Sequence, residues 1–145
     1  MKKLFLFLVV FITNINIVNG QDKKSILIFG DSITAGYGVE PQQAFPAILQ
    51  NKIDELSLNY DVINGGLSGE TSAGGLRRID WVLQRKIDIM ILELGGNDGL
   101  RGIDLSSTKQ NLEQIIEKAR AKYPDIEILI AGMQVPPNLG TDYTK

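Results

Sequence analysis

Short apolar runs alternate with longer stretches of helical spacing from position 25 onward. The apolar runs predict four β-strands, at Ser25–Phe29, Tyr60–Asn64, Ile87–Leu94 and Glu127–Ala131. Apolar residues repeating every three or four positions predict helices between them, at Pro41–Leu58, Ala73–Arg85 and Ser107–Tyr123. Nearly continuous apolar strands separated by helices are typical of a parallel sheet that is covered on both faces. The pattern therefore predicts an α/β fold with three layers.

Two of the expected helices carry local signals. The apolar stripe of the first one consists of Phe45, Ile48, Leu49, Ile53 and Leu56. Pro41 and Pro46 leave the start of this helix open, because proline fits only the first turn of a helix. We expect the third helix to begin at Ser107, with Gln110 as its partner in a capping box.

The first twenty residues have a different composition from the rest. Lys2 and Lys3 precede the apolar run Leu4–Ile12, and Val18-Asn19-Gly20 precedes Gln21. This order is typical of a secretory signal peptide that is cleaved before Gln21. The apolar run is too short for a membrane-spanning helix, which needs about 20 such residues. We expect a signal peptide at 1–20, a single domain at 21–145, and a periplasmic or secreted protein without a stable membrane anchor.

Composition excludes several classes of chemistry. The 145 residues include 15 basic and 17 acidic side chains, and removal of the two N-terminal lysines leaves 13 and 17, a net charge of −4. Without a basic stripe, nucleic acid is not an expected partner. The sequence has no cysteine and no histidine, which excludes disulfides, thiolate or imidazole metal ligands, a cysteine nucleophile and a histidine base within this chain. We expect neither a metal ion nor an organic cofactor.

The residues after the first expected strand suit a nucleophile. Ligands of parallel α/β sheets bind at the carboxyl ends of the strands. Ser32 follows Gly30 and Asp31 there, at the expected start of a helix. Backbone N–H groups converge at such a place and favour the negative charge of an attacking alkoxide. The alternative is that Ser32 is only the N-cap of a short helix.

Two further strand ends carry possible hydrogen-bond donors. Gly69 lies in the glycine-dense loop 64–72, where its N–H suits an oxyanion; the alternative is a flexible connection. No phosphate-binding glycine motif is present there. Asn97 follows the third strand, and its side-chain amide is a known type of oxyanion donor; the alternative is an Asn-Asp-Gly turn. Glu93, within that strand, is expected to be structural, and if buried it needs a partner, for which the candidates are Arg77, Arg78 and Arg101.

Together these segments resemble the first three sequence blocks of the GDSL, or SGNH, hydrolase family. The strings GDSITAGYG and ELGGNDGLRG are similar to its branch of exported acyl-CoA thioesterases, lysophospholipases and arylesterases. The resemblance runs from about Ile26 to the end of the chain. It implies a flavodoxin-like fold and cleavage of esters or thioesters through an acyl-serine. It also implies that Ser32 is the nucleophile, that its own N–H, the Gly69 N–H and the Asn97 side chain form an oxyanion hole, and that Asp31 is a turn residue.

One family block has no counterpart in this sequence. The family carries an Asp-x-x-His near its C-terminus, which supplies the general base. This sequence has no histidine and stops at Lys145, and Asp104, Asp125 and Asp142 do not lie in that context. We therefore expect a truncated reading frame or a piece of a longer protein, with very weak activity. The fold is then incomplete at its C-terminus, and the sheet edge after the fourth strand is uncovered.

Two functional hypotheses remain from the sequence. The first is a GDSL-type esterase or thioesterase, acting on a small ester, thioester or lysophospholipid. The second is a non-catalytic secreted α/β module that uses the same strand ends to bind an acyl or glycan ligand. An Asp-x-x-His encoded downstream of Lys145 would decide for the enzyme.

Overall fold

A computed structural model describes residues 23–132, so the expected signal peptide lies outside the described residues. The elements in order are β1 (Lys24–Gly30), α1 (Ser32–Ala35), the 3-10 helix η1 (Pro41–Gln43), α2 (Phe45–Glu55), β2 (Tyr60–Gly66), α3 (Ser72–Val82), β3 (Ile89–Glu93), α4 (Gly96–Leu100), α5 (Leu105–Lys122) and β4 (Glu127–Ile130). Within this part of the chain, no helix is long and apolar enough to cross a membrane.

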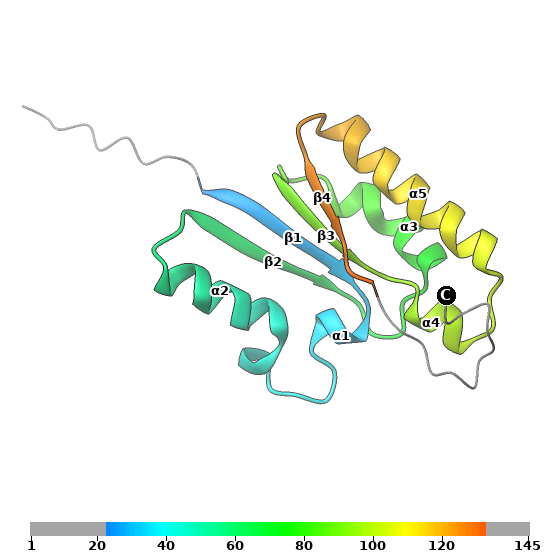
Figure 1. Cartoon of the computed structure of the whole chain (residues 1–145), viewed down its shortest axis with the longest axis horizontal. Helices are drawn as coiled ribbons and strands as arrows, with labels where there is room; N and C mark the ends of the chain where they lie inside the picture. The colour runs from blue at the N-terminus through cyan, green and yellow to red at the C-terminus, as the bar shows by residue number, and fades with distance from the viewer. Residues whose placement is uncertain (1–22, 133–145) are drawn as a thin grey trace, which may run out of the picture.

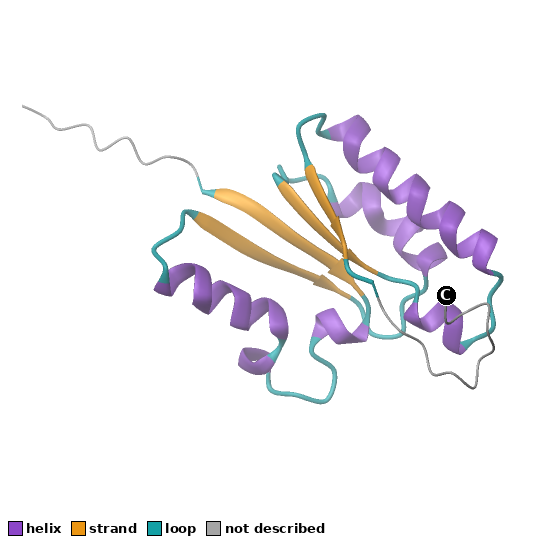
Figure 2. Cartoon of the chain, viewed as in Figure 1, coloured by secondary structure: helices purple, strands orange, loops and turns teal. Residues whose placement is uncertain are grey.

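The four strands form one parallel sheet in the order β2-β1-β3-β4 (Figures 1 and 2). Gly30, the last residue of β1, pairs with Gly66 of β2 on one side and with Glu93 of β3 on the other. The three strands therefore end at the same level. The residues that follow them, from Asp31, Leu67 and Leu94 onward, leave the sheet side by side.

Helices cover both faces of the sheet, which confirms the expected three layers. Helix α2 lies on one face, while α3 and α5 lie on the other (Figure 1). Side chains of β1 alternate between the two, because successive residues of a strand point in opposite directions. Ile26 and Ile28 pack with Ile53 of α2, whereas Leu27 and Phe29 belong to the larger core under α3 and α5. β1 is thus buried on both sides, as its apolar run predicts.

The helix expected at 41–58 is two elements. Ala44 is extended, with ψ of 138°, and separates η1 from α2. The reason is Pro46, which lies in the first turn of α2: its ring would clash with a preceding helical turn. The expected apolar stripe is only partly buried. Ile53 is buried and Leu49 half-buried, but the other three members face solvent: Phe45, Ile48 and Leu56.

The capping box expected at Ser107 is wrong. Helix α5 begins at Leu105, and its N-cap is Asp104, whose Oδ1 accepts a hydrogen bond from the Ser107 N–H at 3.1 Å. Hydrogen bonds from the Ser106 hydroxyl and the Ser107 N–H lower the pKa of Asp104. An aspartate three residues upstream therefore caps the helix in place of Ser107.

β4 is one edge of the sheet within the described residues. It pairs only with β3, and Leu129 and Ile130 are 52% and 64% exposed. An apolar edge with unpaired backbone groups is a template for association with another chain. The uncovered edge expected from the sequence is present in this part of the chain.

We predict that Gly66→Ala detaches α1 from the sheet. A Cβ on Gly66 would lie 2.2 Å from the backbone nitrogen of Ala35, and backbone atoms cannot yield as a flexible side chain can. The free energy of unfolding should fall by about 1–3 kcal/mol, as in other overpacked sites. The control is Gly132→Ala, because a Cβ there meets nothing within 4 Å. Urea unfolding measures both; equal values for the two variants would contradict the prediction.

Candidate active site

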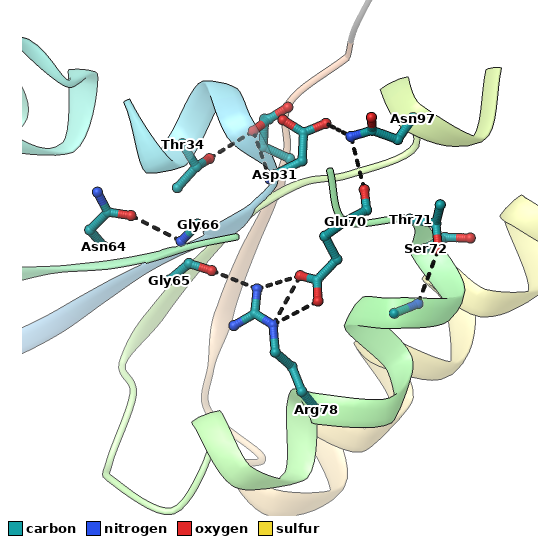
Figure 3. A network of polar contacts seen from close by, with 12 residues as sticks. Asp31, Thr34, Asn64, Gly65, Gly66, Glu70, Thr71, Ser72, Arg78 and Asn97 are labelled. Carbon is teal, nitrogen blue, oxygen red and sulfur yellow. Dashed lines mark hydrogen bonds and ion pairs between the residues drawn. The ribbon is translucent and has the colours of Figure 1, made fainter. Parts of the chain in front are cut away.

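The side chain of Asn97 joins the ends of three strands. It lies in α4, directly after β3, and its Nδ2 donates to Oδ2 of Asp31 at 2.9 Å and to the carbonyl oxygen of Glu70 at 3.0 Å (Figure 3). Asp31 precedes Ser32, and Glu70 follows Gly69. The three residues singled out from the sequence, Ser32, Gly69 and Asn97, are thus brought together by one amide group. Because both acceptors are oxygens, the nitrogen must face them and the amide orientation is fixed.

Ser32 is the first residue of α1 and is not its N-cap. The cap is Asp31, whose Oδ1 accepts a hydrogen bond from the Ile33 N–H at 2.9 Å. This corrects the alternative in which Ser32 is a capping residue and leaves its side chain available. Neither the N–H nor the hydroxyl of half-buried Ser32 is hydrogen-bonded within residues 23–132. In that part of the chain, no base contacts the hydroxyl.

Gly69 lies in the loop between β2 and α3 with φ of +77°, a conformation that residues with a Cβ rarely adopt. Its carbonyl accepts a hydrogen bond from Nη2 of Arg101 at 2.9 Å. Its N–H donates to no acceptor among the described residues and is exposed. The sharp turn at this glycine therefore presents an unused donor near Asn97.

An ion pair holds this loop in place. Arg78 of α3 reaches up to the buried Glu70, and its Nε donates to both carboxylate oxygens at 2.9 Å (Figure 3). Its Nη2 donates to Glu70 and also to the carbonyl of Gly65, at 2.7 Å. The guanidinium stacks 4.3 Å from the ring centre of Phe29. Arg78 thus binds the chain at Gly65, before the loop, and at Glu70, within it. The loop is therefore held in place and is not the flexible connection that its glycine content suggests.

Buried Asp98 fixes the helix that carries Asn97. Its carboxylate accepts hydrogen bonds from the N–H and hydroxyl of Ser72, at 2.8 and 2.5 Å, and from the hydroxyl of Thr108 at 3.2 Å. These contacts tie α4 to the starts of α3 and α5. The Asn-Asp-Gly segment is therefore the first turn of a helix and not a loop turn. The structural roles of Glu70 and Asp98 were not predicted from the sequence. The available signal was the presence of one acidic residue within each of these two glycine-rich segments.

Glu93 supports the turn at Gly30-Asp31 from the next strand. Its Oε2 accepts hydrogen bonds from the Thr34 hydroxyl at 2.7 Å and from the Asp31 N–H at 3.4 Å, while Oε1 has no partner among the described residues. None of the three arginines considered as partners forms an ion pair with Glu93 among the described residues: Arg78 binds Glu70, Arg101 binds Gly69, and Arg77 is exposed. Burial raises the pKa of this carboxyl, the hydrogen bond from Thr34 opposes the shift, and Asp31 adds to it.

The geometry suits stabilisation of a developing negative charge. At the ends of parallel strands, the N–H groups of Ser32 and Gly69 have no acceptor among residues 23–132, and the Asn97 amide is held by Asp31 and Glu70, the residues next to them. Among residues 23–132, no three carboxylates are grouped so that they could hold a metal ion. The arrangement can polarise a carbonyl group beside a hydroxyl nucleophile.

Comparison with known proteins gives consistent matches. The model of the GDSL-like lipase/acylhydrolase family matches residues 28–145. The esterase TesA of Pseudomonas aeruginosa is 41% identical over 84% of this chain and 60% of its own length. Thioesterase 1/protease 1/lysophospholipase L1 of Escherichia coli is 38% identical over 83% of this chain and 56% of its own length.

A solved structure shares the fold as well. The esterase AlinE4, described as an SGNH-hydrolase family member, superposes with a TM-score of 0.78 at 43% identity, over 84% of this chain and 65% of that protein. The chain thus spans less than two thirds of each of these three proteins. The parallel sheet and its covering helices described above therefore superpose on an SGNH-hydrolase fold.

We predict that Glu93→Gln changes the pH dependence of stability. A carboxyl whose pKa is raised by folding favours the folded state below its unfolded pKa, near 4.3, and this contribution is lost as the pH rises through the folded pKa. Relative to Glu93→Gln, the unchanged chain should therefore gain stability when the pH is lowered from 7.5 to 4.5. Urea unfolding at both pH values measures the difference. If the difference in unfolding free energy between the two proteins is the same at both pH values, the pKa of Glu93 is the same in the folded and unfolded states.

Proposed function

The chain belongs to the GDSL-like lipase/acylhydrolase family, and from that membership we propose that it is part of a serine hydrolase that cleaves carboxylic esters or thioesters. The observation that carries the proposal is the Asn97 amide, which joins the turn of Ser32 to the loop of Gly69. A serine flanked by donors from two other strand ends is what acyl transfer requires.

In the proposed reaction, the Ser32 oxygen attacks the carbonyl carbon of the substrate while its proton passes to a base. The carbonyl oxygen becomes an oxyanion that accepts hydrogen bonds from the N–H groups of Ser32 and Gly69 and from Asn97. The alcohol or thiol then leaves with a proton, and an acyl-serine remains. Water attacks this ester in the same way, which releases the carboxylic acid and restores Ser32.

Both N–H groups of the Asn97 amide already have acceptors, so the oxyanion must take the place of one of them. The carbonyl of Glu70 is neutral, and a neutral acceptor binds more weakly than a charged one. We therefore propose that the oxyanion replaces the Glu70 carbonyl as an acceptor of Asn97. Asp31 keeps its hydrogen bond from Asn97 and continues to orient the amide. Asp31 is then a positioning residue.

The base is the missing part of this proposal. No side chain contacts the Ser32 hydroxyl within residues 23–132, and the sequence contains no histidine. The family resemblance supplies an Asp-x-x-His block for this role, and the chain spans only 60% of the length of the TesA esterase. The second candidate, a non-catalytic module that binds acyl or glycan ligands, would use the same strand ends without such a base.

We also propose that the protein is exported to the periplasm or the medium. The proposal rests on Lys2, Lys3 and the apolar run Leu4–Ile12, which have the order of a signal peptide. Lysophospholipids and other lipid esters are then the accessible substrate class, consistent with the name of the Escherichia coli relative.

We predict that Asn97→Ala lowers kcat by about 10²–10³ in a version of the protein that carries the Asp-x-x-His block, with KM nearly unchanged. The donor acts mainly on the charge that develops in the transition state, so ground-state binding is little affected. Asn51→Ala, on the exposed side of α2, is the matched control. A change in KM alone would make Asn97 a binding residue and would favour the non-catalytic module.

We predict that the 145-residue chain hydrolyses p-nitrophenyl acetate very weakly and only through Ser32. A serine hydroxyl without a base is a poor nucleophile, although oxyanion donors and binding alone retain about 10³–10⁴-fold over water in enzymes that lack a triad member. Ser32→Ala should abolish the residual rate, and Ser68→Ala, in the exposed loop, should keep it. Turnover of about 1 s⁻¹ or more would show that another group in this chain replaces the histidine.

For export, we predict that residues 1–20 direct a reporter enzyme out of the cytoplasm and that the mature protein begins at Gln21. N-terminal sequencing of the exported product checks the cleavage site. Lys2→Glu combined with Lys3→Glu should reduce export, since the charged start is part of the signal. A reporter that stays in the cytoplasm would refute the proposed location.

A further inference from the structure

A second concave site lies beside the outer edge of β2, between that strand and α3. This groove has a volume of about 590 Å³, within the range of small-molecule sites. It is lined by Ile63, Asn64, Gly65, Gly66, Leu67, Arg78, Trp81, Val82, Gln84 and Arg85. None of the residues assigned to the proposed reaction lines it.

The walls of the groove are apolar and open to solvent. Ile63 and Val82 pack against the core under α3, and Leu67 and Trp81 stand at its rim with 52% and 71% of their surfaces exposed. Exposed large apolar side chains around a concave surface mark a place where an apolar group can bind. These four side chains provide a surface for a hydrocarbon chain.

The charge of the groove is positive. Its two charged lining residues are Arg78 and Arg85, and no carboxylate lines it among the described residues. Glu70 offsets the charge of Arg78 through their ion pair. The exposed Arg85 side chain has no ion-pair partner within residues 23–132, so one cation remains uncompensated next to the apolar walls.

Side chains already form hydrogen bonds with several backbone groups at the edge of β2. Gln50 covers its first half: its Oε1 accepts from the Val62 N–H at 2.6 Å, and its Nε2 donates to the Tyr60 carbonyl at 3.3 Å. Asn64 occupies the N–H of Gly66 at 2.9 Å. Backbone groups that side chains already satisfy do not pair with an incoming strand, so part of this edge is closed to β-augmentation.

We propose that this groove binds a single-chain amphiphile with an anionic head group, with the hydrocarbon chain against Leu67, Trp81 and Val82 and the head group at Arg85. The guanidinium binds carboxylate or phosphate through paired N–H groups, so a fatty acid and a lysophosphatidic-type head share the required chemistry. The groove includes the end of β2 but none of Ser32, Gly69 and Asn97. The proposal does not rest on hydrolysis, because it concerns binding alone.

The experiment uses Trp81, which is the single tryptophan of the 145 residues, as its reporter. The chain is titrated below micelle concentrations with dodecanoate, dodecyl phosphate, dodecyltrimethylammonium and acetate. The two anionic amphiphiles should shift the Trp81 emission to shorter wavelength with saturation, because binding covers an exposed indole. The better of the two anions identifies the preferred head group. Dodecyltrimethylammonium should bind at least about tenfold more weakly, and acetate should not bind in the same range.

Three variants test whether binding takes place in the groove. Arg85→Gln should weaken the binding of both anions by about tenfold or more and leave the cationic amphiphile unchanged. Arg77→Gln, an exposed arginine on α3 that does not line the groove, is the matched control and should bind as the unchanged chain does. Ser32→Ala should also bind normally, so a loss of hydrolysis and a loss of binding are independent results.

Four outcomes would overturn the proposal. They are an emission that does not change with dodecanoate or dodecyl phosphate, equal binding of the cationic amphiphile, binding of acetate as tight as that of dodecanoate, and equal losses in Arg85→Gln and Arg77→Gln. The first would show that anionic amphiphiles do not bind near Trp81, and the second that the charge of the head group does not matter. The third would show that the hydrocarbon chain does not contribute to binding, and the last that binding does not take place in the groove. Circular dichroism of each variant confirms that it is folded.

Discussion

The register of the three strands β2, β1 and β3 is the constraint on which the site depends. Gly30 pairs with Gly66 on one side and with Glu93 on the other, so three segments leave the sheet at one level. A shift of one strand by one residue would turn its core side chains to the wrong face, and the buried residues of β1 forbid it. The amide of Asn97 can therefore span from Asp31 to Glu70 without any special backbone geometry in the strands.

Besides Asp31, three buried acids hold the segments that follow these strands, and each is accommodated differently. Glu70 is paired with an arginine, and Asp98 receives hydrogen bonds from Ser72 and Thr108. Glu93 has the Thr34 hydroxyl and one backbone N–H, and burial raises its pKa. The loops are thus held in place by the polar contacts of these three acids, because the loops themselves contribute few apolar side chains.

Much of the fold could be predicted from the sequence, since continuous apolar strands and helical spacing determine the layers directly. The grouping of Ser32, Gly69 and Asn97 could also be predicted, because parallel strands end at one edge. The partners of buried charges could not: Arg77, Arg78 and Arg101 are equivalent in sequence, and only tertiary packing selects Arg78 for Glu70 and leaves Glu93 without a cation. The capping residues of α1 and α5 could not be predicted for a local reason, because Asp31 and Asp104 compete with the nearby serines as caps.

Arg78 has a consequence of its own, because it touches two places at once. Its guanidinium holds Glu70, beside the turn of Gly69, and it also lines the groove along β2. A ligand in the groove that draws this guanidinium toward itself must loosen the hold on Glu70, and a firmly held loop must disfavour that ligand to the same extent, since linkage is reciprocal. Through this one shared cation, a substitution at Arg78 would act on the groove and on the loop of Gly69 at the same time.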